Sequence, residues 1–154
     1  MPSRFTIIFV LSVMGALHGW IGWRLLPALG IDAVWQGVGV LLLVLSFVLI
    51  PAGLLARGIK RQPLSDRLAW VGMLVMGLFS SLLLLTIVRE LALLALSLLH
   101  LATPAMIESS ARAVVGCALL LTAVGYMNAR RLAAVVEVEI PLADLPQALH
   151  GFTI

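Results

Sequence analysis

Charge is scarce in this sequence of 154 residues: only 11% of the residues are Asp, Glu, Lys or Arg. Soluble domains typically contain about 25% of such residues. A chain that is also 62% hydrophobic has too much apolar surface to bury inside a small water-soluble globule. The composition likewise excludes a disordered chain and a nucleic-acid-binding domain, which would need a dense basic surface.

Cysteine and metal-binding side chains are also few. Cys117 is the single cysteine, so it cannot form an internal disulfide. Three histidines and seven acidic residues are scattered along the chain, and they match no pattern of a metal site, a P-loop, a dinucleotide fold or a serine hydrolase. We therefore expect no catalytic, cofactor-binding or metal-binding residue in this chain.

Long apolar runs are what the sequence does contain. A helix that spans a bilayer needs about 20 mostly apolar residues, and four runs meet this need, at about 5–23, 33–56, 68–88 and 111–127. The first run is longer than the core of a signal peptide, which has about 7–15 residues, and no cleavage site follows it. We expect an all-α membrane protein in which residues 1–131 form a four-helix transmembrane bundle.

A further apolar stretch follows the adjacent charges Arg89 and Glu90 and reaches Ala102. One helix over 68–102 would be about 52 Å long at 1.5 Å per residue, well beyond a hydrocarbon core of about 30 Å. Because a charged pair in the middle of a bilayer is costly, we expect the third helix to leave the membrane at this pair. Residues 91–102 would then form an extra segment at the interface or against the bundle, with a fifth span as the alternative.

The adjacent pair Arg89 and Glu90 is expected to anchor the bundle at the membrane interface. Neighbouring side chains on a helix point about 100° apart, so these two residues need not pair with each other. Binding of a headgroup or support of a partner domain is the functional alternative.

Three glycines in the first span, Gly15, Gly19 and Gly22, lie on one helical face. Small residues with this spacing allow helices to approach closely in a membrane. We expect packing within the bundle, with a homodimer as the alternative. His18 lies inside this motif and is expected to hydrogen-bond a neighbouring helix.

The distribution of Lys and Arg predicts the orientation. Four spans place both termini on one side, and seven of the ten cations lie on that side. The positive-inside rule therefore puts both termini in the cytoplasm, at a bacterial inner membrane. Four of the seven cations form one basic loop, which we expect to attract anionic lipid headgroups. They are Arg57, Lys60, Arg61 and Arg67.

The end of the chain changes character. Residues 135–140 alternate apolar and polar side chains and are rich in β-branched types, which is typical of a strand. A strand without a partner cannot bury itself. We expect residues 132–154 to be a short β-prone cytoplasmic tail, the start of a soluble domain that these residues do not contain.

Three motifs follow one another at the end of the chain: NARR at 128–131, VEVEIP at 136–141 and LPQALHGFTI at 145–154. Nearer the front the sequence has GWRLLP at 22–27, PLSDR at 63–67 and the adjacent charges at 89–90. Together these segments resemble the N-terminal region of bacterial membrane-bound metallophosphoesterases, in the calcineurin-like phosphoesterase family. In that family a multi-span region ends in an N-A-R-like exit, followed by a V-x-V-x-I-P strand and an L-P-x-x-L-x-G strand.

The resemblance implies a hydrolase of phosphate esters that uses two divalent metal ions. In the family, the aspartate-x-histidine motif that supplies the first metal ligands follows the last of these strands, after the position of Ile154. The resemblance therefore assigns no metal ligand or catalytic residue here, and it implies that this chain anchors a catalytic domain. The alternative is a complete small membrane protein that acts as a scaffold or accessory subunit of a transporter or enzyme complex.

Overall fold

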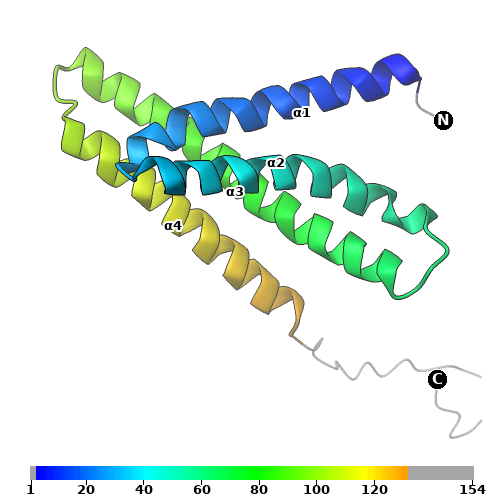
Figure 1. The fold of residues 1–154 in the computed structure, drawn as a ribbon. Coiled ribbons are helices and arrows are strands. Elements are labelled where there is room, and N and C mark those ends of the chain that lie inside the picture. Colours follow the sequence, from blue (N-terminus) through cyan, green and yellow to red (C-terminus); the bar gives the residue numbers. More distant parts are fainter. Residues whose placement is uncertain (1–2, 132–154) are drawn as a thin grey trace, which may run out of the picture.

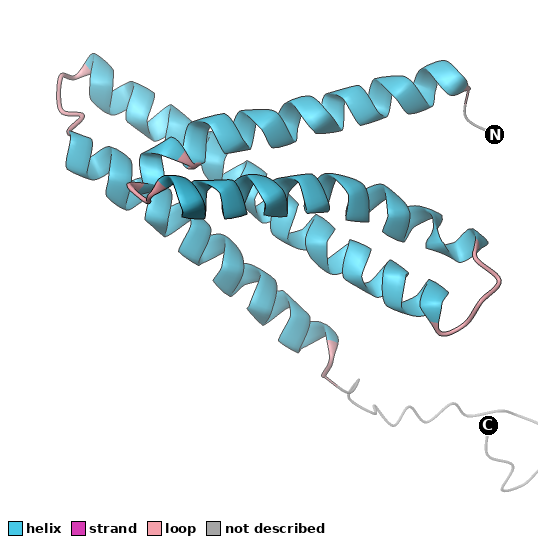
Figure 2. Cartoon of the chain, in the orientation of Figure 1, coloured by secondary structure: helices cyan, strands magenta, loops and turns pink. Residues whose placement is uncertain are grey.

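The computed structural model describes residues 3–131, which form four long helices joined by short loops (Figure 1). Over this part of the chain the structure has helices and loops only (Figure 2). This confirms the all-α bundle that the apolar runs predict. The elements in chain order are α1 (Arg4–Leu25), η1 (Pro27–Leu29), α2 (Ala33–Leu55), η2 (Ala56–Gly58), α3 (Leu64–Leu98) and α4 (Pro104–Ala129). The strand expected at 135–140 lies outside the described residues.

Three of the helices begin at a polar residue that caps the first turn. The side chains of Ser3, Asp32 and Thr103 each accept a hydrogen bond from a backbone N–H three residues later, over 3.0 to 3.3 Å. Such caps satisfy one of the backbone donors that a helix N-terminus leaves open. The polar residues between the apolar runs therefore set where these helices start.

Each of the four helices is long and apolar enough to cross a bilayer. Few of their side chains are buried inside the bundle, and most of the large apolar ones are exposed on its surface. In water this surface would drive aggregation, whereas in a bilayer it faces lipid. The chain is therefore a multi-pass membrane protein.

The third helix does not end at Arg89. It continues without a break to Leu98, so it has 35 residues and a length of about 52 Å. The separate segment expected at 91–102 is instead the end of α3 followed by the loop to α4. The Arg89 side chain turns into the bundle, where only 4% of its surface stays exposed, so its charge does not require the helix to end there.

The four helices meet at one end of the bundle, and α1 and α4 diverge from each other toward the other end, where α2 and α3 stay together (Figure 1). The buried residues of α1 all lie in its C-terminal half, at His18, Ile21 and Leu25. Those of α4 lie between its second turn and its middle, at Ala111, Val114 and Ala118. The buried residues of α1 and α4 therefore lie near the α1–α2 turn, beside the C-terminal part of α3.

Candidate functional site

The compact end of the bundle contains a group of five charged residues, which we call the charged layer. Its centre is Arg89, whose guanidinium donates to Ser110 Oγ at 3.0 Å, to the carbonyl oxygen of Ile107 at 2.9 Å and to Glu90 Oε1 at 2.6 Å. Two of these partners belong to α4, so Arg89 fastens α3 to α4. The members of the charged layer are Arg24, Arg89, Glu90, Glu108 and Arg112.

Glu90 extends the charged layer to the first helix. One of its carboxylate oxygens accepts from Arg89 and the other from Arg24 at the end of α1. The neighbours Arg89 and Glu90 therefore do pair, although their positions on the helix alone do not require it. The Arg24 guanidinium also lies 5.7 Å from the centre of the Trp23 ring, within the range of a cation–π contact.

Arg112 and Glu108 complete the charged layer on α4. Arg112 pairs with Glu108 one turn earlier and donates from Nε to the carbonyl oxygen of Leu29 at 3.3 Å. The adjoining Gly30 has φ +65, in the left-handed region that favours glycine. A Cβ at this position would lie 2.6 Å from Glu108 Oε1, so a larger residue would displace the Glu108 side chain as well as strain the backbone.

Polar groups in the charged layer have partners inside the protein. Among the described residues, no buried side-chain nitrogen or oxygen lacks a hydrogen-bond partner. Taking a charge out of water is costly unless it is paired and hydrogen-bonded. The buried charge of the layer, Arg89, meets this condition through its own partners. This arrangement is typical of a structural contact that holds α3 against α4, which we call the clamp.

The spacing of arginines locates the charged layer relative to a bilayer. Arg24 follows Arg4 by 20 residues on α1, Arg89 follows Arg67 by 22 on α3, and Arg130 follows Arg112 by 18 on α4. At 1.5 Å per residue these separations are about 27 to 33 Å, close to the hydrocarbon thickness of about 30 Å. The charged layer therefore matches one membrane boundary.

The opposite boundary, which we call the basic end, holds the other arginine of each pair. There the Arg130 guanidinium lies 5.1 Å from the Tyr126 ring and 6.0 Å from the Trp70 ring. Aromatic and cationic side chains of this kind are typical of a membrane–water interface. Lys60, Arg61 and Arg67 of the predicted basic loop are exposed at this end, and Arg57 lies within η2.

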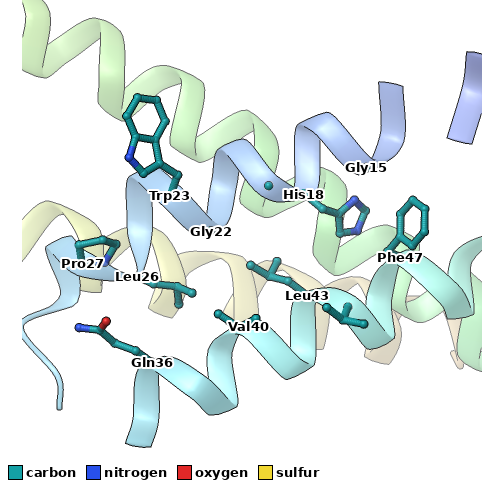
Figure 3. Close-up of a pocket in the computed structure, with 12 residues that line it drawn as sticks. Gly15, His18, Gly22, Trp23, Leu26, Pro27, Gln36, Val40, Leu43 and Phe47 are labelled. Atoms are coloured by element: carbon teal, nitrogen blue, oxygen red, sulfur yellow. The ribbon is translucent and has the colours of Figure 1, made fainter. Parts of the chain in front are cut away.

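The glycines of the predicted packing motif border a groove between α1 and α2 (Figure 3). A Cβ on Gly22 would lie 3.0 Å from Leu43 Cδ1, and one on Gly15 would lie 3.4 Å from the Phe47 ring. A Cβ on Gly19 would meet nothing within 4 Å. The groove has a volume of about 550 Å³, so Gly15 and Gly22 approach side chains of α2 while Gly19 faces open space.

The closest helix approach involves two glycines that sequence reasoning missed. A Cβ on Gly72 of α3 would lie 2.6 Å from the Cα of Gly53 on α2, and a Cβ on Gly53 would lie the same distance from the Cα of Gly72. Both distances end on backbone atoms, which cannot rotate away. The two glycines thus mark the crossing point of α2 and α3.

His18 connects α1 to two other helices. Its Nδ1 lies 2.8 Å from the carbonyl oxygen of Met14, and its Nε2 lies 3.1 Å from Ser46 Oγ on α2. Its ring stacks on Phe79 of α3, with centroids 3.9 Å apart and planes 7° apart. The expected hydrogen bond from His18 to a neighbouring helix is confirmed. Nε2 makes this bond, and Nδ1 bonds within α1.

The described residues do not form a dimetal centre, which the resemblance places after Ile154 and so outside them. Across residues 3–131, the structure brings no three His, Cys, Asp or Glu side chains together as metal ligands would be. We therefore derive no step through a metal ion from this part of the chain.

Comparison with known proteins found no match for this chain. No family model, no curated protein and no solved structure matches this chain. What the chain does must therefore be argued from its own geometry.

Proposed function

We propose that this chain is the membrane anchor of a cytoplasmic enzyme and that the enzyme is a metal-dependent phosphoesterase. The observation that carries the anchoring role is the charged layer. Its charges satisfy one another, and three helices place it one bilayer thickness from the basic end. A transport path needs ionisable or polar groups that face a cavity, whereas Arg89, the buried centre of the layer, is enclosed by its own partners.

The phosphoesterase part of the proposal depends on the family resemblance of the sequence. The C-terminal group of resembling segments begins at Asn128, at the end of α4, so α4 would deliver the tail directly to the catalytic domain. The two divalent ions would supply activated water for phosphate-ester hydrolysis in that domain. The role of the described residues is to hold it at the membrane surface.

We further propose that the basic end faces the cytoplasm of a bacterial inner membrane. The cations of the basic loop lie there, together with the first and last arginines of the bundle. Cytoplasmic loops are enriched in Lys and Arg, and anionic lipids attract each such residue by about 1 kcal/mol. The loop would then help to hold the anchored domain close to the bilayer.

Cysteine labelling tests this orientation. In a Cys117→Ala background, we expect Lys60→Cys to react with a membrane-impermeant maleimide only after the cells are permeabilised. Leu99→Cys, beyond the charged layer, should react in intact cells, because Leu99 is 66% exposed and lies about 15 Å past Arg89 along the helix. The reverse pattern would contradict the orientation.

A scaffold or accessory subunit is the second candidate function. It is favoured by the α3–α4 hairpin, which continues past the charged layer (Figure 1) and exposes several large apolar side chains. Apolar surface outside the hydrocarbon region is typical of a protein interface. The residues concerned are Leu91, Leu94, Leu98, Leu99 and Leu101.

The two functions are distinguished by the native product. The protein would be purified from its source membrane, its intact mass measured, and the fraction assayed for hydrolysis of bis(4-nitrophenyl) phosphate with Mn²⁺ and with EDTA. For an anchored phosphoesterase, we expect a mass above 16.5 kDa and hydrolysis that EDTA abolishes. A mass of 16.5 kDa without hydrolysis would overturn the proposal in favour of the scaffold. A larger mass without hydrolysis would leave an anchor and overturn the phosphoesterase.

A further inference from the structure

A second groove, which we call the α2–α4 groove, lies on the other side of α2 from the groove of Figure 3. It has a volume of about 550 Å³ and runs along α2, with α3 supplying the largest share of the remaining lining and α1, the α1–α2 turn and α4 the rest. Ser46 is the single polar side chain along it, and its hydroxyl is engaged with His18. The lining includes Leu42 and Leu49 of α2, Val75 and Leu82 of α3, and Val115 and Leu119 of α4.

The size and the apolar lining of the α2–α4 groove favour a hydrocarbon chain over water as its occupant. Its volume far exceeds the about 30 Å³ that one water occupies, and an apolar cavity does not hold water stably. Two of its lining residues, Leu42 and Leu119, are more than half exposed, so the groove opens sideways to lipid. The groove extends from Trp35 to Leu49 along α2, about 21 Å at 1.5 Å per residue, which suits an extended acyl chain.

Polar groups lie at one end of the α2–α4 groove, where it reaches the charged layer. Arg112, Val115 and Leu119 share one face of α4, because they are three and seven residues apart. The Arg112 side chain is 60% exposed, and its Nε bonds the carbonyl oxygen of Leu29, a residue of the groove lining. Arg112 therefore stands at the mouth, directly above the α4 wall.

The mouth of the groove has charges of both signs. Two of the five N–H groups of Arg112 are used by Leu29 and Glu108, so three remain for a phosphate. Glu108 lies against Gly30, and Asp32 follows two residues later at the start of α2. A headgroup with one negative and one positive charge complements a mouth that has both signs.

We propose that the α2–α4 groove binds a phosphatidylethanolamine molecule from the leaflet at the charged layer. One acyl chain lies in the groove, the phosphate contacts Arg112, and the ammonium group contacts Glu108 or Asp32. Trp35 flanks the mouth from the opposite wall, a position typical of an interfacial tryptophan. This inference is independent of the phosphoesterase proposal, because it concerns the bundle alone.

Native mass spectrometry of the detergent-purified chain, titrated with phosphatidylethanolamine, tests the proposal. We expect one lipid to bind per chain. Arg112→Gln should weaken binding about fivefold, the effect of one interfacial cation. Val115→Trp, which fills the groove, should weaken it about tenfold or more.

Leu120→Trp is the matched control. Leu120 lies five residues after Val115 on α4, is 66% exposed and does not line the groove. This variant should therefore bind like the wild type. Circular dichroism verifies that all variants keep their helices, and the exposed Arg112 gives a variant with little risk to folding. Undiminished binding by Val115→Trp would overturn the groove as the site. Equal affinity for phosphatidylglycerol would overturn the headgroup assignment.

Discussion

Gly72→Ala is expected to destabilise the bundle by about 1–3 kcal/mol, the cost of overpacking a tight contact. The new methyl group would lie 2.6 Å from the Cα of Gly53 and 2.8 Å from the carbonyl oxygen of Leu49. Because both atoms are backbone, α2 and α3 must separate to admit it. The free energy of unfolding, measured by SDS titration in mixed micelles, gives the effect.

Gly77→Ala is the matched control for this substitution. Gly77 is on the same helix, and a Cβ there would meet nothing within 4 Å. Replacing an unconstrained helical glycine with alanine favours the helix by up to about 1 kcal/mol, so this variant should be neutral or more stable. If both variants had equal stability, the close approach of α2 and α3 would be contradicted.

The pairing of the two glycines can be tested by a double substitution. Once Gly72→Ala has pushed α2 and α3 apart, Gly53→Ala should cost much less than it does alone. Residues in direct contact typically show coupling of about 0.5–3 kcal/mol. Additive effects would mean that Gly53 and Gly72 act at separate places.

Arg89→Ala is the second substitution with a large expected effect, a loss of about 3 kcal/mol of stability. It removes hydrogen bonds from a charged donor to Ser110, Ile107 and Glu90, and such bonds contribute about 1.5–3 kcal/mol each. It also leaves Glu90 with Arg24 as its one partner in the charged layer. The same unfolding measurement gives the result.

Arg112→Ala provides the comparison for Arg89. In its ion pair with Glu108, the Arg112 side chain is 60% exposed and the Glu108 side chain 44% exposed. An exposed pair of this kind contributes at most about 1 kcal/mol to stability. The two arginines are close in the structure and differ in burial. A cost for Arg89→Ala no greater than that for Arg112→Ala would contradict the clamp between α3 and α4.

The helices were predictable from the sequence because the bilayer imposes a length. A run of about 20 apolar residues in hydrocarbon must satisfy its backbone internally, so it forms a helix. The continuation of α3 past Arg89 was not predictable in the same way. Sequence shows that Arg89 is charged, but the partners that allow it to be buried, Ser110 and Ile107, are on another helix.

The contacts between helices escaped prediction for a related reason. The spacing of Gly15, Gly19 and Gly22 is a local signal, and the motif was visible although Gly19 contacts no neighbour within 4 Å. Gly53 and Gly72 are single glycines in separate spans, so their meeting depends on where α2 and α3 cross. The spacing of the arginines can be read from the sequence. Their grouping into one charged layer could not be predicted, because it depends on how the helices pack.

The divergence of α1 and α4 gives the bundle the shape of a wedge (Figure 1). The buried residues of α1 and α4 gather near the charged layer, so these two helices spread over more area in the leaflet at the basic end. A wedge displaces more lipid from one leaflet than from the other, and this mismatch is relieved where the bilayer curves. Such a protein is expected to concentrate in membrane regions whose curvature matches its taper, independently of any partner.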